Sequence, residues 1–179
     1  QLYREDQLSR LSFQYATRLL SQSIHQIQNR LTPNDYNGQS VLLVSGDNFS
    51  DELAGQLACD MLEAGGYEVR YCGGGIANDE IVAELSDREI DRLVIFSTDA
   101  RTLPFTRQLI DRLHNIGSCP TLQIIVGGGV FNRAPGLAEE IGADVWTEDP
   151  LELVEVMLDC PEDRMTHDQR TVGRKRRAA

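Results

Sequence analysis

The chain has 179 residues, of which 41% are hydrophobic and 25% charged, with a formal net charge of −11. This balance is typical of a globular protein, and the negative charge argues against the chain gripping a nucleic-acid backbone by itself. No apolar run approaches the roughly 20 residues that span a bilayer, so no membrane association is expected. The four scattered cysteines form no CxxC pair, so we expect a cytoplasmic protein without disulfides or a zinc site. Because the first residue is Gln1 and not Met, we expect a piece of a longer protein.

The first segment, residues 1–32, has helical periodicity. Its apolar side chains recur at gaps of three and four, and Pro33 ends the pattern. They are Leu8, Leu11, Tyr15, Leu19, Leu20, Ile24, Ile27 and Leu31. The spacing predicts a long amphipathic helix, a remnant of a helical bundle. Its stripe predicts self-association or pairing with an upstream helical or DNA-binding region. Residues 33–39 are expected to be a linker.

From residue 40 onward, short apolar runs alternate with helical patterns. The predicted strands are 41–45, 67–72, 93–96, 122–126 and 143–146. The predicted helices are 51–64 with Ser50 as N-cap, 79–85, 104–116, one short helix ending at Ile141, and 150–158. Five such units predict an α/β domain over 40–160, a flavodoxin-like, doubly wound, five-stranded parallel sheet of order 2-1-3-4-5.

The last segment, 161–179, is expected to be a disordered basic tail. Its charge gathers in Arg174, Lys175, Arg176 and Arg177. Through this cluster, or through an upstream region, the protein could touch nucleic acid.

Three loops at the carboxyl ends of the strands are the expected ligand site, because the strand order reverses there. They are 46–51, 97–103 and 127–132. Acidic residues around the first loop argue against a phosphate there, and the chain's only lysine is Lys175, which also argues against a phospho-receiver domain. Asp47 and Asp51 could hold a divalent cation, but helix capping and solvation explain them as well.

The three loops together resemble the cobalamin-binding domain. That family has Asp-x-His-x-x-Gly after the first strand, Ser-x-Leu after the third and Gly-Gly after the fourth. The matching stretches here are 46–52, 97–99 and 126–131, and the resemblance is closest to sensory members such as antirepressors and light-sensing repressors. It implies a cofactor site made of Asp47, Phe49, Ser97, Asp99, Gly127, Gly128, Gly129 and Phe131.

The departures from the family pattern bear on the metal. Phe49 stands where the family has its cobalt-ligating histidine, Glu52 replaces the glycine, and Asp99 replaces the leucine. Phenylalanine cannot ligate a metal. The three histidines lie elsewhere, and only His25, on the first helix, is a candidate upper ligand; His114 and His167 are not.

The resemblance implies a regulatory or sensory domain, part of a transcriptional regulator, that binds cobalamin with the cofactor's own base on cobalt or has lost the cofactor. Haem is a further cofactor to test. One alternative is the corrinoid carrier module of a methyltransferase or mutase, and another is a cofactor-free module that binds a protein partner. No catalytic grouping is found, so we expect no enzyme.

Overall fold

The computed structural model describes residues 8–28, 30–117 and 119–165. The chain divides into two compact units, 1–32 and 33–179. The first contains one helix, α1 (Arg10–Gln28), which is shorter than the predicted helix. It begins after Ser9, whose hydroxyl oxygen accepts a hydrogen bond from the Ser12 backbone N–H at 3.1 Å, as an N-cap does. Residues 1–7 and 29, which the prediction included, lie outside the described residues.

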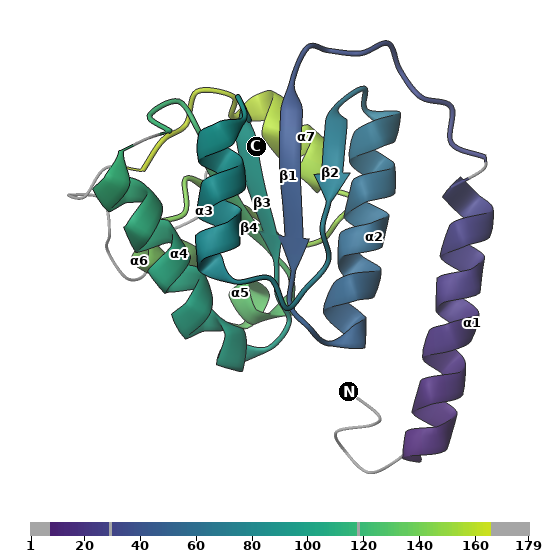
Figure 1. Cartoon of the computed structure of the whole chain (residues 1–179). Coiled ribbons are helices and arrows are strands. Elements are labelled where there is room, and N and C mark those ends of the chain that lie inside the picture. Colours follow the sequence, from purple (N-terminus) through teal and green to yellow (C-terminus); the bar gives the residue numbers. More distant parts are fainter. Residues whose placement is uncertain (1–7, 29, 118, 166–179) are drawn as a thin grey trace. The chain divides into compact units, whose positions relative to one another are not determined.

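The second unit is built on a five-stranded parallel sheet of order β2-β1-β3-β4-β5, which confirms the predicted flavodoxin-like architecture (Figure 1). The strands are β1 (Ser40–Ser45), β2 (Glu68–Tyr71), β3 (Arg92–Phe96), β4 (Gln123–Gly127) and β5 (Val145–Thr147). The helices are α2 (Phe49–Ala64), α3 (Asn78–Asp87), η1 (Ala100–Thr102), α4 (Leu103–Ile116), α5 (Gly129–Arg133), α6 (Leu137–Ile141) and α7 (Leu153–Asp159).

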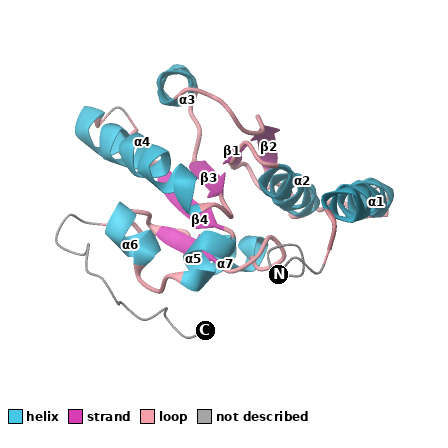
Figure 2. Cartoon of the chain, turned by 90° about the horizontal axis from the view of Figure 1, so that it is seen from below, coloured by secondary structure: helices cyan, strands magenta, loops and turns pink. Residues whose placement is uncertain are grey.

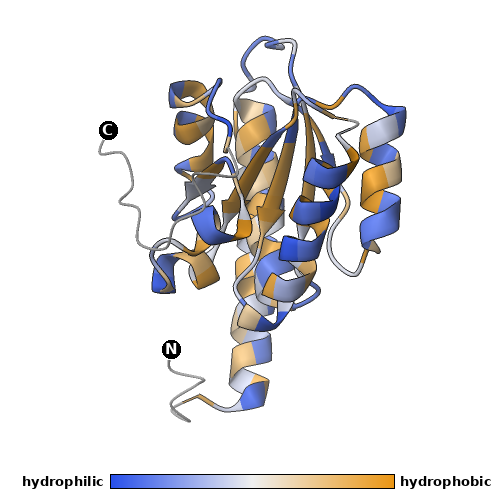
Figure 3. Ribbon diagram, turned by 90° about the vertical axis from the view of Figure 1, so that its left-hand side faces the viewer, coloured by the Kyte–Doolittle hydropathy of each residue, from blue (hydrophilic) through white to orange (hydrophobic). Residues whose placement is uncertain are grey.

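Helices cover both faces of this sheet, as the view along the strands shows (Figure 2). Successive side chains of a strand point to opposite faces, so the central strands feed two cores. Leu42, Leu93 and Ile124 pack with α3, α4 and α6. Val41, Val94 and Ile125 pack with α2 and α7. In Figure 3 the strands are accordingly the predominantly orange, hydrophobic part of the unit.

Three local predictions are wrong. The N-cap of α2 is Asn48, not Ser50, because the Asn48 side chain accepts the Asp51 backbone N–H at 3.1 Å. The short helix expected before Ile141 is two helices, α5 and α6, separated by residues 134–136; Gly136 has a left-handed φ of 86°. The last helix begins at Leu153 and not at Pro150.

Residues on either side of the α/β core are tied to it. In the expected linker, the Asn34 backbone N–H donates to the Ala64 carbonyl at the end of α2, at 2.9 Å. In the expected tail, the Met165 backbone N–H donates to the Asp144 carboxylate at 2.5 Å. Burial raises the pKa of Asp144, and the backbone N–H groups of Ile124 and Met165 oppose that rise. Residues 166–179, with the basic cluster, lie outside the described residues.

No helix within the described ranges is both long and apolar enough to cross a membrane.

Candidate functional site

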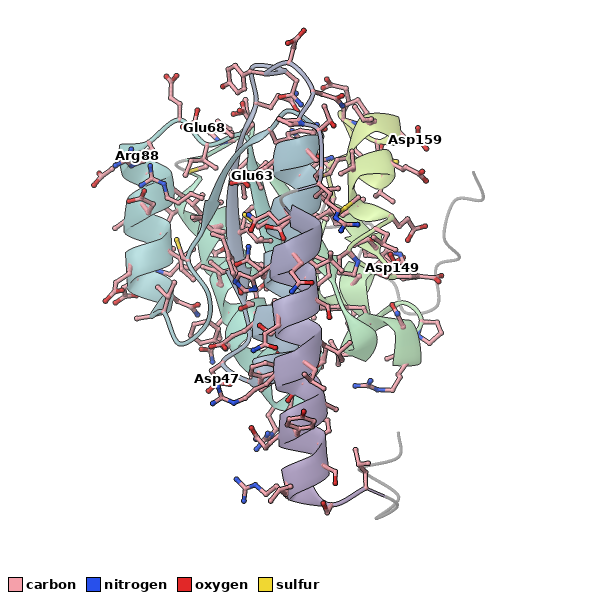
Figure 4. The ribbon with its side chains drawn as sticks, turned by 90° about the vertical axis from the view of Figure 1, so that its right-hand side faces the viewer. Asp47, Glu63, Glu68, Arg88, Asp149 and Asp159 are labelled. Atoms are coloured by element: carbon pink, nitrogen blue, oxygen red, sulfur yellow. The ribbon has the colours of Figure 1, made fainter. Side chains whose placement is uncertain are left out.

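Three loops meet at the carboxyl edge of β1, β3 and β4, where the strand order reverses. We call residues 46–51, 97–99 and 127–131 the loop platform. Backbone hydrogen bonds continue the sheet into it: the Gly46 N–H donates to the Phe96 carbonyl at 3.0 Å, and the Ser97 N–H donates to the Gly127 carbonyl at 2.9 Å. Figure 4 places Asp47 at this edge and Glu68 and Asp159 at the opposite one. In open α/β sheets this edge is where ligands bind.

Asp51 joins the first two loops of the platform. Its side chain is fully buried, and one carboxylate oxygen accepts the Thr98 backbone N–H at 2.7 Å. The other oxygen accepts the Asn48 side-chain amide at 2.5 Å. Gly46 packs so closely against this carboxylate that a Cβ there would overlap it. Asp51 is therefore a structural residue of the platform, and its burial explains it better than a cation site does.

The environment of Asp51 shifts its titration. Burial raises the pKa of this carboxyl, the hydrogen bonds from Thr98 and Asn48 oppose the rise, and the nearby Asp99 charge adds to it. Desolvation disfavours the charged form of a buried acid. The platform thus rests on a carboxyl that takes up a proton more readily than an exposed aspartate does.

The third loop closes against the second. Gly128 has a φ of 104°, and a Cβ there would overlap the Ser97 carbonyl, so only glycine fits. The Arg133 guanidinium of α5 reaches back and donates to the Thr98 carbonyl at 2.7 Å. Arg133 was missed by sequence reasoning, which stopped at Asn132. These contacts make the three loops one connected surface.

The predicted site residues fall into different environments. Asp47 is exposed, Phe49 is half-buried as the first residue of α2, and Asp99 is half-buried and hydrogen-bonded to Arg101. Ser97 is buried, with its hydroxyl beside the Thr102 hydroxyl. Phe131 is also buried and packs in the core beside α4, so its ring is a core side chain.

Gly127 makes room for a neighbouring side chain of the protein. It stands in register between Phe96 and Thr147. A Cβ at Gly127 would lie 2.8 Å from the Thr147 methyl and 2.9 Å from the Phe96 ring. The Phe96 ring is fully buried. On the face of the sheet that α2 and α7 cover, the space beside Gly127 is filled by the Phe96 ring.

No imidazole belongs to the described part of the platform. His114 lies in the last turn of α4, near the opposite edge, where it lines a cavity of about 300 Å³ with Asp144. His25 lies on α1, and its Nδ1 is 2.8 Å from the Ser21 carbonyl oxygen. His167 is outside the described residues.

Among the described residues, one group of potential metal ligands has its donor atoms within 4.8 Å of one another: Cys59, Asp60 and Glu63 of α2. Burial raises the pKa of Cys59 to about 12, with a further rise from the Glu63 and Asp60 charges. The Cys59 thiol is therefore protonated at neutral pH when no metal is bound, and we do not assign a metal centre to this group.

Fold and platform together define a doubly wound α/β domain whose loop platform lies at the switch point of the sheet. The chain belongs to the B12 binding domain family, whose model matches residues 40–155. The family resemblance of the sequence is thereby confirmed.

The relatives found are named as corrinoid or cobalamin proteins. Dimethylamine corrinoid protein 1 of Methanosarcina acetivorans is 25% identical over 103 residues, which is 58% of this chain and 47% of that protein. The chain thus spans about half the length of this curated relative. The sensory subtype that the sequence suggested finds no support among these names.

Solved structures share the fold. The monomethylamine corrinoid protein of Methanosarcina barkeri superposes with a TM-score of 0.78 at 19% identity, covering 88% of this chain and 74% of that one. A cobalamin-binding protein of Desulfitobacterium hafniense gives 0.61 at 17% identity, with the same coverage. The methanol:cobalamin methyltransferase complex of Methanosarcina barkeri gives 0.63 at 15% identity, covering 94% and 64%.

The residues of the platform fit a corrinoid that keeps its own base on cobalt, but not one whose cobalt takes a ligand from the protein. Its side chains beside Phe49 offer carboxylates, hydroxyls and the Asn48 carboxamide, and within the described residues none of them has a nitrogen lone pair for cobalt. The residues present therefore do not fit a cofactor whose lower ligand comes from the protein. They leave open a corrinoid whose lower position is filled by its own base.

Proposed function

We propose that the loop platform binds a corrinoid without supplying a ligand to cobalt, so that the cofactor stays base-on. The observation that carries this proposal is Phe49 at the start of α2, in the place where the family pattern has histidine. A phenyl ring packs against apolar surface but has no lone pair for a metal. Membership of the B12 binding family supports the choice of ligand.

Two roles follow from such a domain. The names of the relatives favour a corrinoid carrier that works with a methyltransferase. The lost histidine favours a regulatory or sensory domain, which was the role suggested by the sequence, because carrier modules of this family depend on that ligand. A regulator should change its association state when the cofactor binds, whereas a carrier should not. Sedimentation velocity with and without adenosylcobalamin separates the two roles.

A third role, a cofactor-free interaction module, is favoured by one observation. The buried Phe96 ring and the Thr147 methyl already fill the space beside Gly127. If this packing leaves no room for a corrinoid, the chain binds protein partners without a cofactor.

The first test is an absorbance titration of the purified chain with hydroxocobalamin and adenosylcobalamin, with haemin as a comparison. We expect saturable, stoichiometric corrinoid binding with the spectrum of the base-on form. Absence of binding contradicts the proposal. A histidine-coordinated spectrum in the wild type also contradicts it, and His25→Ala then identifies the ligand.

The substitution Phe49→His tests the geometry of the platform. If Phe49 stands beneath the bound corrinoid, the imidazole should compete with the cofactor's own base and shift the spectrum toward histidine coordination. Phe49→Leu is the matched control, because it shortens the same side chain without adding a ligand, and its spectrum should stay base-on. Identical spectra for both variants would place the cofactor away from Phe49.

A further inference from the structure

A cleft of about 370 Å³ opens between α3 and α4, at the carboxyl ends of β1 and β3. It lies on the face of the sheet opposite to the one that α2 and α7 cover. Of the predicted site residues, only Asp47 and Ser97 line it; Phe49, Asp99, Gly127, Gly128, Gly129 and Phe131 do not. Its volume lies within the range of small-molecule sites. The cleft is thus largely separate from the surface assigned to the corrinoid.

The floor of the cleft is apolar. It is formed by Val44, Ile76, Ile81, Ile95 and Leu109, from both central strands and both helices. Phe105 lies at the rim and is 43% exposed, a large ring left in water beside an apolar hollow. Burying such surface under a ligand is favourable by about 25 cal/mol per Å².

Three hydroxyl groups that line the cleft are already paired within the protein. The Thr106 hydroxyl donates to the Thr102 carbonyl at 3.2 Å, and the Thr102 hydroxyl donates to the Asp99 carbonyl at 2.7 Å. The Ser45 hydroxyl pairs with the Tyr71 hydroxyl at 3.2 Å. A polar ligand would gain few new hydrogen bonds here, so apolar contact must supply most of its affinity.

The charges at the mouth of the cleft disfavour an anionic ligand. Arg101 is exposed and is held by Asp99, to which its Nε donates at 2.8 Å. Asp47 is exposed beside it. Because Asp99 already neutralises Arg101, the charge left at the mouth is that of Asp47, which repels an anion. Asp47 is exposed and solvated, so it adds little to the affinity for a cation. The cleft therefore suits an uncharged ligand.

Three consecutive glycines between β2 and α3, residues 73–75, keep the mouth of the cleft open. Gly73 and Gly75 have φ values of 73° and 76°, and a Cβ at either position would meet nothing within 4 Å. Both line the cleft. The sequence analysis did not predict this cleft, although three glycines after an edge strand, next to the switch point, were a usable signal.

We propose that this cleft binds a neutral, mainly apolar small molecule of one or two rings, as an effector site distinct from the corrinoid surface. Gly46, Asp47 and Ser97 belong to both the cleft wall and the loop platform, so an occupant of the cleft contacts the loops that form the platform. This inference goes beyond the proposed function and does not depend on it.

The test is methyl NMR of the full chain titrated with indole, a neutral two-ring probe. Saturable shifts are expected for the methyl groups of Ile76, Ile81 and Ile95, and none for Leu62 or Ile125 in the opposite core. No shift at the cleft up to the solubility limit of indole overturns the proposal, as do equal shifts in both cores.

A blocking variant sharpens the result. Ala77 is exposed, lines the cleft and precedes α3, so Ala77→Phe should fill the mouth without disturbing the core. Ala83→Phe, at an exposed position of the same helix away from the cleft, is the matched control. We expect indole to bind Ala77→Phe at least roughly tenfold more weakly, a loss of about 1.4 kcal/mol, and Ala83→Phe like the wild type. Equal affinity of the two variants overturns the assignment.

Hydroxocobalamin binding to the same variants keeps the two proposals apart. Ala77 is not part of the loop platform, so corrinoid binding should be the same in Ala77→Phe and in the wild type. A chain that binds indole in the cleft but no corrinoid would retain this inference and lose the proposed function.

Discussion

Asp51 shows how much of the platform rests on single residues. From the sequence, it was one of several carboxylates near a helix N-terminus, explained by the helix dipole and solvation. In the structure it is fully buried and accepts hydrogen bonds from Thr98, 47 positions along the chain, and from Asn48. A buried acid with such partners holds two loops in register, and this role cannot be read from local spacing.

Asp51→Asn should change how stability depends on pH. Because burial raises the pKa of the folded-state carboxyl above the value of 3.8, its protonated form contributes stability that is complete below pH 3.8. This contribution is lost as the pH rises through the folded-state pKa. We therefore expect the variant to gain stability relative to the wild type as the pH increases over that window. Urea unfolding of both proteins from pH 4 to pH 7 measures the difference; a difference that is constant with pH would contradict the assignment.

At the scale of elements, the start of α2 decides where Phe49 lies. With Ser50 as the cap, Phe49 would belong to the loop. With Asn48 as the cap, Phe49 is the first helical residue and is fixed by the helix. Serine and asparagine are about equally good N-caps, so the sequence does not choose between them. The fit of Asn48 beside the buried Asp51 makes the choice.

A pair of alanine substitutions tests this start. Asn48→Ala removes the cap of α2 and the hydrogen bond to Asp51, so we expect a loss of about 1 kcal/mol in the free energy of unfolding. Ser50→Ala, at an exposed position, should change it by less than about 0.5 kcal/mol. Denaturant unfolding at neutral pH measures both. A larger loss of unfolding free energy for Ser50→Ala than for Asn48→Ala would identify Ser50 as the N-cap.

At the scale of the whole molecule, α1 carries an apolar stripe that faces water. Leu11, Tyr15 and Leu19 are 79%, 65% and 45% exposed and follow one another at intervals of four, so they share one side of the helix. Large exposed apolar side chains in a row mark interaction surfaces. We propose that this stripe pairs with a second copy of the chain, which is one of the two partners that the sequence suggested.

Sedimentation velocity tests the stripe. The full chain should self-associate, and the double substitution Leu11→Glu with Leu19→Glu should yield monomers, because two charges would be buried in the contact. Ser21→Glu with Gln28→Glu adds the same charge on another side of α1 and should leave the association unchanged. A wild-type chain that is monomeric at all concentrations would contradict self-association.

The sequence by itself determined the α/β architecture and the strand order, because strands buried on both faces are continuous apolar runs and short βα connections leave few topologies. It also determined the family, through glycine and acid positions in three loops. Only the tertiary structure decided that Asp51 is buried, that Phe96 fills the space beside Gly127, that Phe131 is a core residue, and that a cleft opens between α3 and α4. The physical reason is distance along the chain. Each of these features depends on packing between segments that are remote in sequence, and local periodicity carries no information about which side chains meet there.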